Sequence, residues 1–198
     1  WINVQKSRER YGKNLLWRVL SVMRLKPRFQ GDDWNYWWKT EFQNYDFLPR
    51  AVENAIELGC GPYTNFRLIA QKCRPKHLFL SDPLIRTYVK FKLPFVSEMY
   101  RKARCIIDDH PIEECPFAPN YFDLTVLINV LDHVQDAEVS IEKAIDITKP
   151  GGTLLIGQDL TNEVDMNRPE VRDDIGHPIK IDHDFLDEMT RRGAYGFA

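Results

Sequence analysis

The segment AIELGCGPYTNF, residues 55–66, places one acid and two glycines around a predicted turn. Gly59 and Gly61 have no Cβ, so backbone N–H groups can approach a ligand closely there. A helix predicted to begin near Thr64 would add unpaired N–H groups and a partial positive charge, which suit a phosphate or a carboxylate. Glu57, at the end of the preceding apolar run, could hold a cation. The segment therefore predicts a ligand-binding turn directly after a strand.

A second acid, Asp82, ends the next apolar run, at roughly the 20-residue offset after a glycine turn that is usual for a ribose-binding carboxylate. Its two oxygens can accept hydrogen bonds from the 2′- and 3′-hydroxyls, so a nucleoside is the expected ligand. A dinucleotide fingerprint would need Gly or Ala at Thr64. Glu57 favours S-adenosylmethionine instead, because the amino-acid part of that molecule carries an ammonium and a pyrophosphate brings no cation.

A third polar group lies in LDHVQD, residues 131–136. His133 could act as a general base because the pKa of histidine lies close to neutral, and Asp132 stands beside it. Helix capping or core packing by His133 is the alternative interpretation.

Farther along, the segment GHPIKIDHDF, residues 176–185, could join His133 and Asp159 around a divalent metal. We expect no metal site, because an aspartate here is better explained as the cap of the following helix. The residues concerned are His177, Asp182, His183 and Asp184.

These residues need elements that bring them together, and from residue 54 short apolar runs alternate with helical stretches. We predict strands at 54–59, 77–82, 104–108, 121–130 and 151–160, and helices at 64–73, 83–102 with an interruption at Pro94, and 136–148. Such alternation predicts an α/β fold with a doubly wound, mainly parallel sheet. Ligands bind such sheets beyond the carboxyl ends of the strands.

The first 50 residues differ in composition, so we divide the chain into a helical, aromatic cap, 1–50, and a ligand-binding domain, 51–198. Residues 7–26 have the pattern of an amphipathic helix. The aromatic block after it either packs the cap on the sheet or closes over the ligand. Its members are Trp34, Tyr36, Trp37, Trp38, Phe42, Tyr45 and Phe47. The sheet is expected to be truncated at the C-terminus.

Composition narrows the function. The formal net charge is −2, which argues against nucleic acid as a partner, since binding to phosphates needs a basic excess. No apolar stretch approaches the roughly 20 residues of a membrane helix. The four cysteines include no Cys-x-x-Cys pair, which argues against a zinc or disulfide framework and for a reducing cytoplasm. The expected partner is a small molecule.

Four segments in order, ELGCGP, LFLSDP, PFAPNYFDLTVLINVLDHVQD and ITKPGGTLLIG, resemble the class I S-adenosylmethionine-dependent methyltransferases, in particular the broad small-molecule group. The resemblance covers roughly residues 54–160. It implies S-adenosylmethionine as cofactor and in-line methyl transfer to a small-molecule acceptor, such as a sugar or metabolite hydroxyl. The alternatives are a scaffold or regulatory domain that retains the fold and, less favoured, an NAD(P)-dependent oxidoreductase.

The resemblance also implies a role for each position. Glu57 would face the methionine ammonium, Asp82 would hold the ribose, and Asp108 or Asp109 would accept from the adenine amino group. Tyr63, where many members have glycine, would widen the turn or cover the cofactor. Backbone and apolar contacts would come from Gly59, Cys60, Gly61, Pro83, Leu84, Asn129, Val130 and Leu131, with Asp132 and His133 as catalytic candidates.

Overall fold

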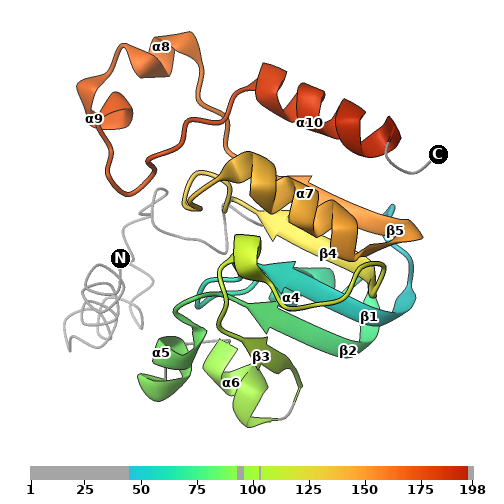
Figure 1. Ribbon diagram of the computed structural model, residues 1–198. Helices are drawn as coiled ribbons and strands as arrows, with labels where there is room; N and C mark the ends of the chain where they lie inside the picture. Colours follow the sequence, from blue (N-terminus) through green and yellow to red (C-terminus); the bar gives the residue numbers. More distant parts are fainter. Residues whose placement is uncertain (1–44, 93–95, 103, 196–198) are drawn as a thin grey trace, which may run out of the picture. The chain divides into compact units, whose positions relative to one another are not determined.

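Five parallel strands form the centre of the fold in the computed structural model, which describes residues 45–92, 96–102 and 104–195 (Figure 1). Their order across the sheet is β3-β2-β1-β4-β5, and every neighbouring pair is parallel. The predicted doubly wound α/β class is confirmed. The strands are β1 Ala51–Leu58, β2 Arg74–Ser81, β3 Ile106–Asp108, β4 Phe122–Ile128 and β5 Thr148–Gly157.

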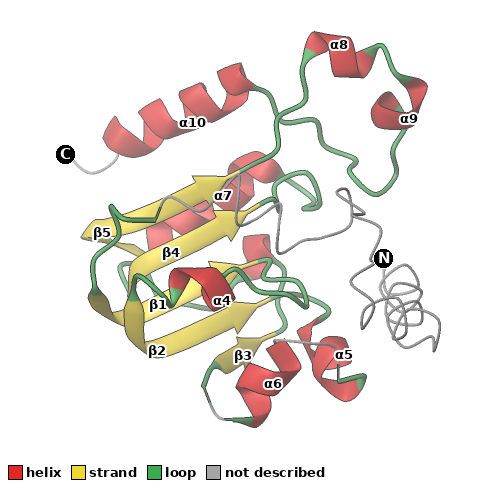
Figure 2. Ribbon diagram, turned by 180° about the vertical axis from the view of Figure 1, so that it is seen from behind, coloured by secondary structure: helices red, strands yellow, loops and turns green. Residues whose placement is uncertain are grey.

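Helices cover both faces of this sheet. Figures 1 and 2, seen from opposite sides, place α7 in front of one face and α4 in front of the other. Such cover buries the inner strand β4, in which every residue except the half-buried Asp123 is buried. The helices are α4 Phe66–Ile69, α5 Ile85–Lys90, α6 Val96–Arg101, the 3₁₀ helix η1 Ile112–Glu114, α7 Ala137–Ile147, α8 Glu163–Met166, α9 Pro169–Arg172 and α10 His183–Tyr195.

Burial increases along β1 and β2 toward their carboxyl ends. In both β1 and β2 the last four residues are buried, whereas the first four are exposed or half-buried. Glu57 and Ser81 therefore end their strands inside the protein, and the loops that follow start from rigid, desolvated positions. This is the edge at which the sequence predicts the ligand.

The segment ITKPGGTLLIG folds differently from the prediction. The sequence predicts that a helix ends at 148 and that a strand begins at 151, with Pro150 between them. Instead β5 begins at Thr148 and runs through both glycines. A register shift absorbs the extra residues, since Phe122 pairs with Thr148 but Leu124 pairs with Thr153. Gly151 has a left-handed φ of 76° at this bulge.

Helix α4 is also shorter than the predicted helix at 64–73. It ends at Ile69 because β2 begins at Arg74, earlier than predicted, where it pairs with Ala51 of β1. The remaining residues form turns that leave Cys73 buried. The pairing of β1 with β2 thus overrides the local helical pattern.

The predicted cap at 1–50 lies almost wholly outside the described residues, as do the amphipathic helix at 7–26 and most of the aromatic block. That division of the chain stays a prediction. None of the helices in the described ranges is long and apolar enough to cross a membrane. All four cysteines are free thiols, in agreement with the expectation of no disulfide.

Candidate functional site

The turn after β1 packs directly against the loop after β4. Gly59 has a φ of 66°, and a Cβ built on it would lie 2.1 Å from Cγ2 of Val130. A side chain at Gly59 is therefore excluded twice, by backbone conformation and by contact. Gly61 also has a left-handed φ, of 54°. The two glycines bring bare main chain to the carboxyl end of the sheet, as the sequence predicted.

Glu57 is held entirely by the turn that follows it. One carboxylate oxygen accepts from the backbone N–H and side-chain amide of Asn65, at 2.8 and 2.9 Å. The other accepts from the Thr64 hydroxyl and from the Phe66 N–H. Burial raises the pKa of Glu57 above its ordinary value, although these donors act in the opposite direction.

These contacts give Glu57 a different place from the one the resemblance implied. A carboxylate offers about four acceptor positions, and the turn fills them all. Glu57 supplies the N-terminal cap that the side chain of Asn65 does not give to α4. The contacts indicate a positioning role for Glu57, and its contact with the methionine ammonium stays a prediction.

Asp82 links the end of β2 to the glycine turn. One of its oxygens accepts from the Gly61 N–H at 3.0 Å and the other from the Leu84 N–H at 2.8 Å. Tyr88 donates a further hydrogen bond from its side chain. Because Asp82 is only 9% exposed, burial raises its pKa, against the effect of these donors. The three donors leave the carboxylate about one further acceptor position beside bare main chain, which can accept from a ribose hydroxyl.

The two candidates for the adenine contact have different partners. Asp108, at the end of β3, accepts from the Ser81 hydroxyl at 2.9 Å and lies 2.8 Å from Nδ1 of His110. The hydrogen bond with Asp108 raises the pKa of His110. Asp109 forms a two-contact ion pair with Arg86, which lowers the pKa of Asp109. Both remain candidates.

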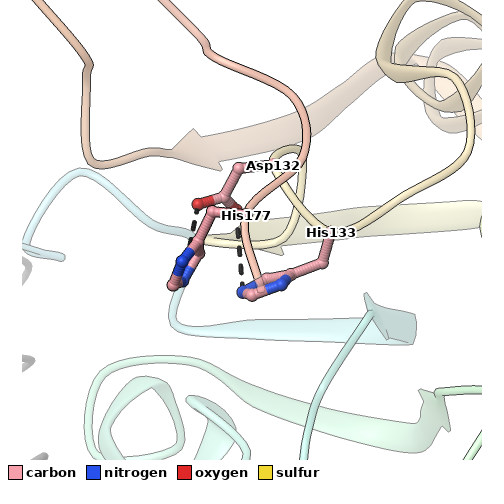
Figure 3. A group of neighbouring side chains, drawn as sticks. All are labelled: Asp132, His133 and His177. Carbon is pink, nitrogen blue, oxygen red and sulfur yellow. Dashed lines mark ion pairs between the residues drawn. The ribbon is translucent and has the colours of Figure 1, made fainter. Parts of the chain in front are cut away.

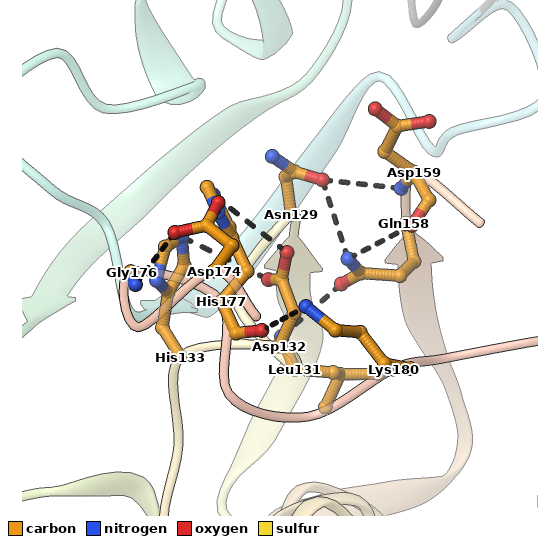
Figure 4. A network of polar contacts seen from close by, with 10 residues as sticks. All are labelled: Asn129, Leu131, Asp132, His133, Gln158, Asp159, Asp174, Gly176, His177 and Lys180. Carbon is orange, nitrogen blue, oxygen red and sulfur yellow. Dashed lines mark hydrogen bonds and ion pairs between the residues drawn. The ribbon is translucent and has the colours of Figure 1, made fainter. Parts of the chain in front are cut away.

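The loop after β4 is fixed to β5 through amide side chains (Figure 4). Asn129 has a φ of 50°, and its side-chain oxygen accepts from the N–H of Asp159 at 3.1 Å. Gln158 donates to the same oxygen at 3.3 Å and accepts from the Leu131 N–H at 3.1 Å. Gln158 was missed by the sequence analysis, and its place as the first polar residue after the apolar run of the strand predicted at 151–160 is the signal that could have found it.

Two of the histidines singled out in the sequence meet beside Asp132 (Figure 3). Nε2 of His133 lies 3.8 Å from one Asp132 oxygen, and Nε2 of His177 lies 4.0 Å from the other. The two ring centroids are 4.5 Å apart. His177 comes from the loop between α9 and α10, about 45 residues beyond His133 in the sequence.

The other residues of that predicted metal set are not part of this group. Asp182 accepts from the Phe185 N–H at 2.8 Å and caps α10, as expected. His183 and Asp184 are exposed. The backbone of Asp159 bonds to Asn129 instead. Sequence spacing could not identify this division, because it depends on how the loop folds back.

A cavity of about 630 Å³ lies away from this site, between α4, α6 and the first residues of β2. Basic side chains surround it, whereas the site above lies at the opposite ends of the strands. Its lining residues include Arg67, Arg74, Lys102 and Arg104. We place the ligand by the glycine turn and Asp82, whose chemistry the cavity does not share.

Comparison with known proteins assigns a family. Residues 56–156, half of the chain, match the family described as "Methyltransferase domain". Among curated proteins, probable polyketide synthase 23 of Dictyostelium discoideum is 29% identical over 54% of this chain, and tRNA U34 carboxymethyltransferase of Desulfotalea psychrophila is 29% identical over 50%. These alignments cover only 5% and 30% of the relatives' own lengths.

Solved structures show the same fold. YcgJ from Bacillus subtilis has a TM-score of 0.59 at 16% identity, over 73% of this chain and 62% of that one. The N-methyltransferase NodS of Bradyrhizobium japonicum has a TM-score of 0.52 at 22% identity, over 71% and 72%. Phosphoethanolamine N-methyltransferase 2 of Haemonchus contortus, solved with S-adenosyl-L-methionine, has a TM-score of 0.52 at 17% identity, over 75% and 34%.

The family match and these folds confirm the resemblance seen in the sequence and the cofactor it implied. The glycine turn, where Gly59 has no room for a Cβ, and the parallel strand order are the parts of this chain that agree with it. The chain belongs to the class I S-adenosylmethionine-dependent methyltransferases.

Proposed function

We propose that this chain transfers a methyl group from S-adenosylmethionine to a small-molecule acceptor, with a sugar or metabolite hydroxyl as the acceptor group. The observation that carries the proposal is the pairing of Asp82 with the Gly61 N–H at the carboxyl end of the sheet. It puts a desolvated carboxylate beside open main chain, which is the chemistry that binds the ribose of a nucleoside.

The residues of this site would hold the cofactor along the turn. Asp82 binds the ribose, Gly59 to Gly61 provide main chain, and Asn129 to Leu131 form the floor beneath the reacting centre. Asp108 or Asp109 meets the adenine. S-adenosylmethionine supplies a methyl group on a sulfonium leaving group, so the protein needs mainly to position and desolvate the acceptor.

A hydroxyl acceptor also needs to lose a proton. His133 follows the floor residues directly, and its Nε2 faces the Asp132 carboxylate. In the neutral ring this nitrogen can take a proton from the acceptor, and the carboxylate then stabilises the imidazolium that forms. Asp132 is therefore the partner of His133 in this proposal.

The proposal of a small-molecule acceptor rests on the charge of the chain. The net charge of −2 does not favour a nucleic acid. NodS and the phosphoethanolamine enzyme are named as N-methyltransferases, while one curated relative acts on tRNA U34 by its name. We choose a hydroxyl because Asp132 and His133 offer the base that such an acceptor requires.

Isothermal titration of the full chain with S-adenosylhomocysteine and with NAD tests the proposal. We expect binding of the first and none of the second. Asp82→Asn should weaken binding by about 10- to 100-fold, since a desolvated charged acceptor is lost. Asp146→Asn serves as the matched control, because Asp146 is exposed on α7 and forms a surface ion pair with Lys143.

Other outcomes point elsewhere. A chain that binds neither compound supports a scaffold that retains the fold. NAD binding alone supports an oxidoreductase. Equal affinities in the wild type and Asp82→Asn would remove Asp82 from the ribose site and, with it, the observation on which the proposal depends.

A further inference from the structure

Asp132 forms no direct hydrogen bond with His133 or His177 in the group that these three side chains form. Oxygen-to-nitrogen separations of 3.8 and 4.0 Å are too long for direct hydrogen bonds. They are close to the roughly 3.4 Å that separates two ligand atoms, each about 2.1 Å from one tetrahedral zinc ion. One ligand atom from each residue, a carboxylate oxygen of Asp132 and a ring nitrogen of each histidine, lies within 4.8 Å of the other two.

One oxygen of the carboxylate in this group also lacks a hydrogen-bond partner. Asp132 is 9% exposed, and its Oδ1 is fully buried without a hydrogen bond. A buried carboxylate oxygen in that state is costly unless a cation or donor satisfies it. In one tautomer of a neutral histidine, Nε2 carries no proton and has a free lone pair. A cation placed between the three side chains would then be bound by both Nε2 atoms and would satisfy Oδ1.

His177 has the second partner that metal-binding histidines usually have. Its Nδ1 lies 2.7 Å from a carboxylate oxygen of Asp174, whose other oxygen accepts from the Gly176 N–H at 2.8 Å (Figure 4). A hydrogen bond from Nδ1–H leaves the Nε2 lone pair directed toward the group. Lys180 holds the same loop by donating to the carbonyl of His177 at 2.6 Å.

We propose that Asp132, His133 and His177 bind one divalent transition-metal ion, with zinc as the first candidate. Two imidazoles and one carboxylate suit zinc or iron and not magnesium, which prefers oxygen ligands. Three protein ligands leave at least one coordination position open, as in catalytic zinc sites. The sequence alone favoured no metal here, because it could not pair His177 with Asp132.

The open position can take water or the hydroxyl oxygen of the acceptor, and this last role rests on the proposed function. With an ion bound, Nε2 of His133 is a ligand and no longer a base. The ion then assumes the task of making the acceptor hydroxyl more acidic.

The test is titration of the full chain, freed of metal with a chelator, with zinc chloride alone. We expect about one ion per chain, and cobalt(II) should give the visible absorption bands of a four- or five-coordinate site. His177→Gln should weaken binding by about 100-fold or more and remove the bands, and Asp174→Asn should weaken it by about 10- to 100-fold.

The matched control is His110→Gln. His110 belongs to the other cluster of candidate ligands, with Asp108 and Asp109, so this variant should bind zinc as the wild type does. Absence of stoichiometric binding by the wild type, or equal binding by His177→Gln, would overturn the site. Loss of zinc in His110→Gln with retention in His177→Gln would do the same.

S-adenosylhomocysteine binding, measured on the same samples, separates the two proposals. His177→Gln should keep it, which also shows that the variant is folded. Zinc binding without cofactor binding would refute the proposed function and leave the metal site standing, and cofactor binding without zinc binding would do the reverse.

Discussion

At the scale of single residues, the side chain of Glu57 binds the protein's own turn. Its two oxygens accept from Thr64, Asn65 and Phe66, which lie seven to nine residues later. The bonds fold the turn back over the end of β1 and cap α4. The acid that looks most like a cofactor ligand in the sequence thus shapes the turn at which we propose that the cofactor binds.

Glu57→Gln should lower the free energy of unfolding by about 2–3 kcal/mol, because the new amide directs a donor at buried donors. Urea denaturation of the full chain measures this change. Glu53→Gln is the control: Glu53 is exposed and pairs with Lys76, so its change should stay within about 0.5 kcal/mol. Equal effects of the two substitutions would contradict the capping role.

Asp82 predicts a pH dependence of cofactor binding. Burial raises its pKa, so it becomes protonated at a higher pH than an ordinary aspartate does. Ribose hydroxyls bind best to the ionised form. Affinity for S-adenosylhomocysteine should therefore rise with pH through this raised pKa and fall as pH drops below it.

Calorimetry at a series of pH values above the ordinary aspartate range measures this dependence. Asp82→Asn cannot ionise, so its weaker binding should lack this slope. Parallel pH profiles for the two proteins would assign the effect to another group.

At the scale of elements, substitutions at two glycines distinguish the cost of steric overlap from the cost of backbone strain. Both Gly59 and Gly151 have left-handed φ values, but only Gly59 would place a Cβ against Val130; nothing lies within 4 Å at Gly151. Gly151→Ala should cost about 1–2 kcal/mol. Gly59→Ala should cost about 1–3 kcal/mol more, because the turn and the β4 loop must separate.

Thermal and urea unfolding of both variants measure the difference. Val130→Ala removes the closest atom, so the double variant Gly59→Ala/Val130→Ala should recover part of the added cost. No recovery, or equal costs at the two glycines, would mean that the turn does not depend on this contact.

The elements were largely predictable because their cause is local. All five strands appear where apolar runs alternate with helical stretches, and β4 is buried on both faces as its composition indicates. The misplaced boundaries have a non-local cause. Pairing with β1 extends β2 back to Arg74, and pairing with β4 draws Lys149 and Pro150 into β5. No single-segment pattern contains these partners.

The site was predictable to the same extent. Gly59, Gly61 and Asp82 follow from strand-end positions, which sequence patterns identify. The position of His177 beside Asp132 cannot be predicted in this way, because His177 and Asp174 come from a loop that returns to β4. That return is fixed by tertiary hydrogen bonds, such as the one from the Ile179 N–H to the Asp132 carbonyl and the one from Thr161 to Ile181.

At the scale of the whole molecule, cofactor binding should stabilise the fold. A ligand at 100 times its dissociation constant adds about 2.7 kcal/mol to the free energy of unfolding. For a chain of this size that raises Tm by about 5–10 °C. Differential scanning fluorimetry with S-adenosylhomocysteine measures the shift, and NAD at the same concentration should give none. Equal shifts with both would contradict the specificity of the turn.

Because Cys60 lies within the glycine turn, chemical labelling of its thiol can be used to follow opening of that turn. Its thiol is buried between Gly59 and Gly61, and burial raises its pKa well above that of an ordinary cysteine. An alkylating reagent can reach it only when the turn opens, whereas the half-buried Cys105 offers an internal reference. The labelling rate of Cys60 therefore reports how often the turn opens. A ligand bound at the turn should lower this rate.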